Sequence, residues 1–200
     1  MKIELESKVL QAALHCAATK DIRYYLQGVH IKFFSKLQFT ASGTNGHILF
    51  AGVGQALEID DPVDATGLSL IIPYDVVKKL AKNKAFVYFE TLGDNRYILD
   101  DQIFTAVDGT YPDISRVIPP VIDSAQTPST FNPEYLVKAQ KALNTYYGNK
   151  PTTSYLLHQR GDDSAIMHAG GNNAQVIVMP IRGHVLAGHD SIQPFNRDYL

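Results

Sequence analysis

Val29-His30-Ile31-Lys32-Phe33-Phe34 is followed, after Ser35-Lys36, by Leu37-Gln38-Phe39-Thr40. In both segments apolar residues alternate with other residues, which is the pattern of strands that bury one face. The short polar connection between them predicts a tight turn. Because the two strands adjoin in sequence, we expect them to pair antiparallel.

Further segments of the same kind lie on both sides of this hairpin. Gly93-Asp94-Asn95 and Gly161-Asp162-Asp163 have the composition of turns and divide some of these segments from one another. The additional strands are expected at residues 46–51, 68–72, 85–90, 96–99, 103–107, 155–159, 164–168 and 175–180.

Three amphipathic helices are predicted between the strands. The first covers residues 7–20 with Ser7 as N-cap, the second covers 74–84 after Pro73, and the third covers 133–144 after Asn132. Pro133 suits the first position of the third helix. The apolar positions at helical spacing are Val9, Leu10, Ala13, Leu14 and Ala17, then Val76, Val77 and Leu80, then Leu136, Val137 and Leu143.

The order strand, helix, three strands repeats about every sixty residues, without much residue identity between the repeats. This order predicts an α+β protein with antiparallel sheet and its helices on one face. Pro119-Pro120 to Pro128 has the composition of a linker, and the residues after Arg182 have that of a polar tail. We therefore expect a domain over 1–119, a half-domain over 120–183 and a tail over 184–200.

Composition excludes several classes of protein. The 200 residues are 45% apolar, enough for a core, but no run approaches the ~18 apolar residues of a membrane span. The N-terminus has no apolar signal core, so we expect no secretion. The single cysteine, Cys16, cannot form an internal disulfide or a cysteine metal site, which favours a reducing cytoplasm.

Positive charge is concentrated on the predicted helices. The predicted helices contain eight lysines and only two acids, Asp75 and Glu134, so their net charge is +6. The rest of the chain has a net charge of −8, which gives the total of −2. A helix face of this kind would attract the phosphates of duplex DNA without reading bases. The alternative is that the lysines are ordinary solvated helix residues. The eight are Lys8, Lys20, Lys78, Lys79, Lys82, Lys84, Lys138 and Lys141.

Five segments resemble, in the same order, segments of the bacterial DNA polymerase III β subunit, the sliding clamp. They are Asp21-Ile22-Arg23-Tyr24-Tyr25-Leu26-Gln27-Gly28-Val29, Thr44-Asn45-Gly46-His47-Ile48-Leu49, residues 107–119 (VDGTYPDISRVIP), Phe131-Asn132-Pro133-Glu134-Tyr135-Leu136 and Val178-Met179-Pro180-Ile181-Arg182. The resemblance places residues 8–119 on the clamp's middle domain and 126–182 on the second half of its third domain.

The resemblance implies a ring of α+β units with helices around a central hole. It also implies a hydrophobic pocket that receives short partner peptides. The matching positions are Leu26, Thr44, Gly46, His47, Leu49, Pro119, Val178, Met179, Pro180, Ile181 and Arg182. Two departures concern this pocket: Ile48 stands where the family has an arginine at the rim, and Gly183 and a tail replace the family's terminal leucine.

Catalysis and metal binding find little support. Of His158, His168, His184 and His189, only the last two lie close together, beside Asp190, at an uncommon ligand spacing. Ser42, His47 and Asp21 could be named as a catalytic set, but no nucleophile-elbow, P-loop or metalloprotease motif is present. We expect neither an enzyme nor a cofactor.

The sequence therefore predicts a processivity factor that encloses duplex DNA and meets a DNA polymerase, and possibly a clamp loader. The rival hypothesis is a regulator or decoy with the clamp fold that binds replication proteins without encircling DNA. Because the third repeat has no partner within the chain, we expect a homo-oligomer, a dimer joined through the unpaired halves or a tetrameric ring.

Overall fold

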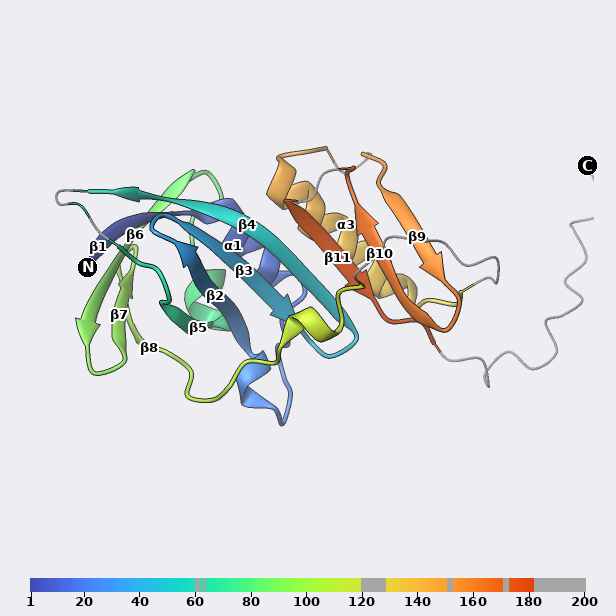
Figure 1. Cartoon of the computed structure of the whole chain (residues 1–200), viewed down its shortest axis with the longest axis horizontal. Helices are drawn as coiled ribbons and strands as arrows, with labels where there is room; N and C mark the ends of the chain where they lie inside the picture. The colour runs from blue at the N-terminus through green and yellow to red at the C-terminus, as the bar shows by residue number, and fades with distance from the viewer. Residues whose placement is uncertain (60–61, 63, 120–128, 151–152, 171–172, 182–200) are drawn as a thin grey trace, which may run out of the picture.

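The computed structural model describes residues 1–200 except 60–61, 63, 120–128, 151–152, 171–172 and 182–200 (Figure 1). The first repeat consists of β1 (Lys2–Glu6), α1 (Ser7–Leu14), β2 (Gly28–Ser35), β3 (Gln38–Thr44) and β4 (Ile48–Glu58). The second consists of β5 (Ser69–Pro73), α2 (Tyr74–Lys78), β6 (Phe86–Gly93), β7 (Arg96–Leu99) and β8 (Gln102–Thr105). The third consists of α3 (Pro133–Tyr147), β9 (Leu156–Arg160), β10 (Asp163–His168) and β11 (Ala174–Val178).

The predicted repeat is thus confirmed twice in full. In the third repeat the helix and three strands are present, and the linker, where a first strand would stand, lies mostly outside the described residues. Short 3-10 turns, η1 (Tyr24–Leu26) and η2 (Ile114–Arg116), lie in two of the connections.

All strands join one antiparallel sheet, which confirms the predicted α+β class. The order along its main path is β5-β2-β3-β4-β1-β6-β7-β8. The opening hairpin forms as expected, with Phe33 opposite Phe39. The long strand β4 pairs with β3, with β1 at its far end and with β11 at its near end, so β11, β10 and β9 extend the same sheet.

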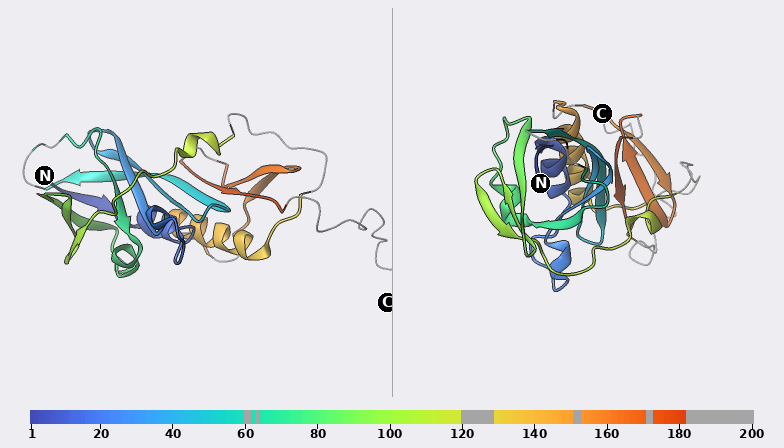
Figure 2. Two further views of the ribbon diagram at one scale, coloured as in Figure 1. Left: turned by 90° about the horizontal axis from the view of Figure 1, so that it is seen from below. Right: turned by 60° about the vertical axis from the view of Figure 1, so that its left-hand side comes forward.

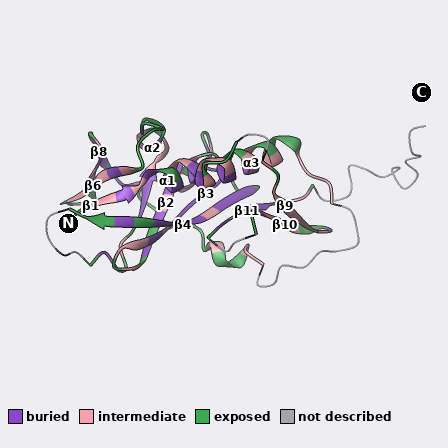
Figure 3. Ribbon diagram, turned by 90° about the horizontal axis from the view of Figure 1, so that it is seen from above, coloured by how far each residue is buried: buried purple, intermediate pink, exposed green. Residues whose placement is uncertain are grey.

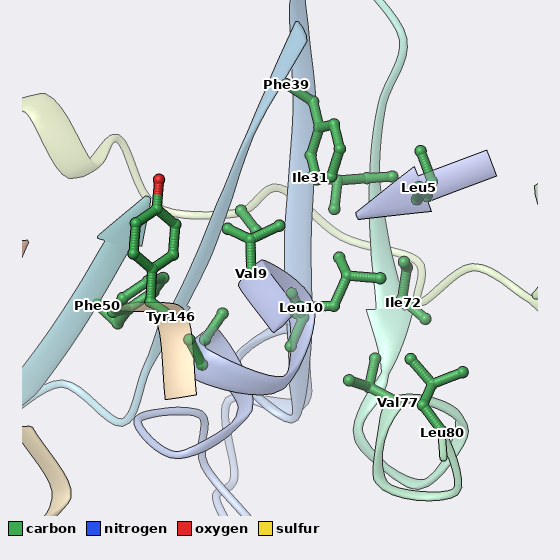
Figure 4. Close-up of a cluster of buried hydrophobic side chains, with 14 of the residues drawn as sticks. Leu5, Val9, Leu10, Ile31, Phe39, Phe50, Ile72, Val77, Leu80 and Tyr146 are labelled. Atoms are coloured by element: carbon green, nitrogen blue, oxygen red, sulfur yellow. The ribbon is translucent and has the colours of Figure 1, made fainter. Parts of the chain in front are cut away.

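The three helices lie side by side on one side of the sheet, with α1 in contact with both α2 and α3 (Figures 2 and 3). The core lies between helices and strands: Val9 and Leu10 of α1 project among strand residues that include Ile31 and Phe39 (Figure 4). Tyr146 of α3 packs on Phe50 of β4 with ring centroids 5.9 Å apart.

Tyr146 also donates a hydrogen bond of 2.7 Å to the carbonyl of Val53 in β4. The third repeat is therefore held to the first through both the helix layer and the β4–β11 strand pair, so the expectation that it has no partner within the chain is wrong. The predicted division at residue 120 does not correspond to a break in the sheet, and the domain limits stay a prediction.

Two helices are shorter than predicted. The amide of Ala18 donates to the carbonyl of Leu26 at 3.1 Å, which turns the chain away from the helix axis after α1. In α2 the side-chain amide of Gln102 donates to the carbonyl of Val76, and the backbone tightens into turns beyond Lys78. Both helices end where tertiary hydrogen bonds take over groups that a longer helix would have used.

The predicted N-cap at Ser7 is wrong. Ser7 lies inside α1, fully buried, and its hydroxyl accepts a hydrogen bond from Gln11. The cap of α3 is confirmed: the side chain of Asn132 accepts from the amide of Glu134 at 3.0 Å, and Pro133 follows it. Val137, expected to face the core, is 48% exposed, because Ala139 and Leu143 form the buried side of α3.

His30 on β2 is a largely buried histidine that packs against an aromatic ring. Its ring stacks on Tyr111 with centroids 4.5 Å apart, and Nε2 lies 2.9 Å from the hydroxyl of Ser69. Burial, and secondly the charge of Lys32, lower the pKa of His30 from 6.5 to about 4. The unfolded chain therefore takes up this proton as the pH falls below 6.5, whereas the folded chain does so only near pH 4.

Stability is consequently expected to fall over this window. Between about pH 7.5 and pH 5, His30 should remove about 1–2 kcal/mol of unfolding free energy, allowing for its partial exposure. Urea unfolding at both pH values measures the loss, and His30→Phe, which keeps an aromatic ring beside Tyr111, should reduce it by that amount. An unchanged pH dependence in the variant would contradict this assignment.

Candidate peptide pocket and lysine face

A tight turn between β3 and β4 forms one wall of the candidate pocket. The hydroxyl of Thr44 donates to the carbonyl of Ile48 at 2.7 Å and accepts from the amide of Gly46 at 3.0 Å. The side chain of Asn45 accepts from the amides of His47 and Ile48. Gly46 has a φ of 89°, a conformation that favours glycine. The residues Thr44–Ile48 therefore fix the shape of the turn.

An arginine lies across this turn. Arg23 donates two hydrogen bonds to Asp21, of 3.0 and 2.7 Å, and a longer one to the carbonyl of Asn45. These bonds lower the pKa of Asp21 to about 2. A Cβ on Gly46 would come within 3.0 Å of the guanidinium, so any other residue there would displace Arg23. The position of Arg23 beside Asp21 thus depends on glycine at position 46, and the Arg23 side chain in turn bonds to the turn at Asn45.

The outer face of the sheet beside this turn is covered by the segment that follows β8. Its residues Ile114, Val117 and Ile118 pack on a buried cluster of Leu49, Ile166 and Ile177 from three strands. Between the turn and this segment lies an apolar cavity of about 180 Å³. We call it the apolar pocket; its lining is Arg23, Leu26, Thr44, Gly46, His47, Ile48, Leu49, Pro112, Asp113, Ile114, Val117, Ile177 and Met179.

Six of the eleven residues predicted for a peptide pocket meet here: Leu26, Thr44, Gly46, His47, Leu49 and Met179. Met179 is held in place because its amide donates to the carbonyl of His47 at 2.9 Å. The structure brings these residues together; whether they bind a peptide stays a prediction.

The other five predicted residues lie elsewhere. Val178 is fully buried in the core, and Ile181 is 41% exposed with its amide bonded to Thr130. Pro119 and Pro180 line a neighbouring hollow that shares Val117 and Met179 with the apolar pocket. Arg182 and the tail lie outside the described residues. Whether the tail covers the apolar pocket therefore stays a prediction.

The expectation for Ile48 needs correction. We expected it to replace a charged rim residue, but its side chain is 1% exposed and belongs to the main core cluster while it also borders the pocket. The cation at the rim is Arg23. Sequence reasoning also missed Pro112, Asp113, Ile114 and Val117, although all four lie in the segment 107–119 that carried the resemblance.

The second candidate site is the helix side of the molecule. A groove among α1, α2 and α3 is lined by Lys8, Lys78, Lys82 and Lys141 together with apolar side chains, including the exposed Val137, and its lining contains no carboxylate. We call it the helix groove. Duplex DNA carries closely spaced phosphates, and such a groove offers them several cations without base-reading groups.

A second groove adjoins the helix groove at Leu14, His15 and Lys141. We call it the loop groove; it adds Lys20 and Lys138, with Asp21 and Arg23 at its far side. The pKa of His15 is lowered by burial and, further, by the positive charges of Lys141 and Lys82. His47 lines both the loop groove and the apolar pocket, so the two candidate sites meet at one turn.

The charge estimate made for the long helices is too high. Within the observed helices, Lys8, Lys78, Lys138 and Lys141 against Asp75 and Glu134 leave +2. Lys84 lies beyond α2 and pairs with Asp100 at 2.7 Å, and Lys79 borders neither groove. Lys8 pairs with Glu6 at 3.1 Å. Lys20, Lys79 and Lys82 lie in the turns beside the helices, and of these Lys20 and Lys82 border the two grooves.

The residues named above for metal binding and for catalysis do not come together as a site within the described part of the chain. His158 and His168 stack at 5.0 Å, but no group of three or more possible metal ligands occurs within the described part of the chain; His184, His189 and Asp190 lie outside it. Ser42 is buried in β3, Asp21 is bonded to Arg23, and His47 stacks on Tyr135, so these three do not form a catalytic series. No helix among the described residues is long and apolar enough to span a membrane.

Repeats of helix and antiparallel strands, with helices on one side and a shared sheet on the other, define the fold of bacterial sliding clamps. The DNA polymerase III subunit beta of Pseudomonas aeruginosa matches it with a TM-score of 0.69 and 16% identity, over 92% of this chain and 67% of that one. The Helicobacter pylori beta clamp bound to a DNA ligase peptide matches with a TM-score of 0.66 and 12% identity, over 90% and 65%.

The Bacillus subtilis DNA polymerase sliding clamp matches with a TM-score of 0.63 and 13% identity, over 92% and 65%. No protein-family model and no curated protein sequence matches the chain. The resemblance is therefore confirmed for the fold, and the chain spans about two thirds of the length of these clamps.

Proposed function

We propose that this protein is a sliding-clamp-like processivity factor. It holds duplex DNA without sequence preference on its helix side and tethers a DNA polymerase or another replication protein through the apolar pocket. Several copies would supply the repeats of a ring. The observation that carries the proposal is the position of the two sites on a clamp fold: lysine-lined grooves on the helix side and an apolar pocket at the outer sheet.

The electrostatics support non-specific DNA binding. Lys20, Lys78, Lys82, Lys138 and Lys141 make no ion pair within the described residues, and they border two grooves that meet at His15. Phosphate contacts of this kind release counterions, so binding should weaken steeply with salt.

The shape of the pocket supports peptide binding. Its lining is mainly apolar, and the polar side chains in it are those of Arg23, Thr44, His47 and Asp113. An extended peptide with an aliphatic or aromatic side chain would fill such a cavity and exclude water from it. The Helicobacter pylori clamp of the same fold holds a DNA ligase peptide.

The second candidate is a clamp-fold regulator that binds replication proteins without enclosing DNA. The observation in its favour is the low charge of the observed helices, whose four lysines are offset by Asp75 and Glu134, and one of which, Lys8, is also paired with Glu6. Such a protein would use the apolar pocket alone.

One experiment separates the candidates. Labelled protein is bound to a nicked circular plasmid at low salt, and half of the sample is then cut once with a restriction enzyme before gel filtration at moderate salt. A ring remains on the circle and slides off the cut DNA. Equal retention on both would show binding without enclosure, and no retention on either would favour the regulator.

A further inference from the structure

His15 lies where the helix groove and the loop groove meet. It follows the last residue of α1 as the C-cap, and it lines both grooves together with Leu14 and Lys141. The residue reaches the surface, so a ligand that lies in either groove can contact its imidazole ring. Histidine is the side chain whose ordinary pKa lies nearest to neutral pH.

A hydrogen bond between two helix segments holds the ring in place. Nε2 of His15 lies 3.0 Å from Oγ1 of Thr145 on α3. Nδ1 makes no hydrogen bond within the part of the chain that the structure describes. In a protonated imidazole both nitrogens donate, and the hydroxyl oxygen of Thr145 accepts from one of them. The N–H at Nδ1 is then left for a ligand in the grooves.

The surroundings of His15 are strongly positive. Within the described residues, the one carboxylate that lines the two grooves is that of Asp21, and it is bonded to Arg23. Glu6 lies outside the lining and is paired with Lys8. The ionisable side chains that line the grooves with His15 are Lys8 from α1, Lys20, Asp21 and Arg23 from the loop after it, His47 from the turn between β3 and β4, Tyr74, Lys78 and Lys82 from α2 and the turn after it, and Lys138 and Lys141 from α3.

These surroundings favour the neutral ring as long as the grooves hold no anion. Burial of part of the ring is the larger cause that lowers the pKa of His15 below 6.5, and the charges of Lys141 and Lys82 lower it further. A phosphate group in the grooves would oppose the effect of the lysines, because a nearby anion favours the charged form of a histidine. The pKa of His15 should therefore be higher in a complex with DNA than in the free protein.

We propose that His15 is a phosphate contact of the duplex and takes up a proton from the solvent when DNA binds. The ring becomes an imidazolium, in which Nε2 keeps its bond to Thr145 and Nδ1 donates to a phosphate oxygen. The inference rests on the proposed binding of duplex DNA, to which it adds one contact residue and one proton. A lysine supplies a charge that ordinarily does not change near neutral pH, whereas this histidine supplies a charge that does.

The linkage between proton and DNA has a definite sign. A group whose pKa is higher in the complex than in the free protein strengthens binding as the pH falls through the range between the two values. One proton changes log affinity by at most one unit for each pH unit. The affinity for duplex DNA should therefore rise about three- to tenfold between pH 7.5 and pH 6. His30, with a pKa of about 4, does not titrate in this range.

Two variants of the full chain test the assignment. Fluorescence anisotropy with a labelled linear duplex is measured at pH 7.5 and pH 6 at one ionic strength. His15→Gln keeps a hydrogen-bonding group beside Thr145 but cannot titrate, so the gain in affinity at pH 6 should fall below about twofold. His15→Lys carries a lasting charge, so it should bind more tightly than the parent at pH 7.5 and also lose the gain at pH 6.

Calorimetry counts the proton directly. Titration of the unmodified protein with the duplex at pH 6.5, in two buffers of different ionisation enthalpy, should show uptake of a substantial fraction of one proton, and His15→Gln should show much less. Circular dichroism checks that both variants fold, and the uptake by the unmodified protein needs no variant.

The possible outcomes separate this inference from the function on which it rests. Equal pH dependence in the parent and in His15→Gln would assign the proton to another histidine, such as His47 in the loop groove, and would overturn the inference. DNA binding without proton uptake would also overturn it, while leaving the proposed function in place. Failure of the unmodified protein to bind duplex DNA at either pH would remove the proposed function, and the inference with it.

Discussion

Simultaneous replacement of Lys78, Lys82 and Lys141 by glutamate should lower the affinity for duplex DNA at low salt by at least about 100-fold, for all sequences alike. These lysines border the helix groove from α2, from the turn after it and from α3, and no carboxylate lines that groove. Each lost phosphate contact should also reduce the slope of log affinity against log salt by about 0.9. Fluorescence anisotropy with labelled duplexes of two unrelated sequences, over a salt series, measures both effects.

The matched control carries the same change in net charge elsewhere. Lys32, Lys79 and Lys150 are exposed and border neither groove, so their replacement by glutamate should alter affinity only a few-fold through long-range repulsion. Circular dichroism confirms that both variants fold. Equal losses in the two triple variants would mean that overall charge, and not the helix groove, governs binding.

Met179→Ala should weaken binding of a pentapeptide rich in leucine and phenylalanine by about 1–3 kcal/mol, roughly 5- to 150-fold. Met179 borders the apolar pocket, is fixed by the hydrogen bond from its amide to His47, and its flexible thioether side chain can adapt to an apolar anchor. Isothermal titration calorimetry measures the loss directly.

Ile181→Ala is the control for this experiment. Ile181 lies two residues further along, is 41% exposed and does not border the pocket, so its removal should leave peptide affinity within about twofold. If both variants bind as the parent does, the pocket is not the peptide site. If neither the parent nor a chain lacking residues 184–200 binds the peptide, the tethering role proposed for it fails.

The strands were predictable because their signal is local. Alternation in β2 and β3 and the turn residues between them were enough to place the hairpin, with its turn shifted by one or two residues. The cap at Asn132 and Pro133 likewise placed the start of α3. Each of these features depends on residues that are neighbours in the chain.

The helix ends and much of the pocket were not predictable in this way. The stripe of apolar residues continues past Leu14, but a hydrogen bond between Ala18 and Leu26 ends α1, and no local pattern encodes that contact. Ile114 and Val117 reach the pocket only because the segment after β8 crosses back over the sheet. The family resemblance predicted six of the residues that line the apolar pocket. The contribution of the segment 112–117 depends on its position in the folded chain and could not be predicted from the sequence.

The long strand β4 joins the first and third repeats directly. It is one uninterrupted strand of eleven residues, and the first and third repeats are both hydrogen-bonded along it, so no hinge separates them. The angle between neighbouring repeats is therefore set by sheet twist before any other copy is met. Repeats that are fixed to each other in this way lose little orientational freedom when the chain joins other copies, so the number of copies in a closed assembly would depend on the geometry of the single chain.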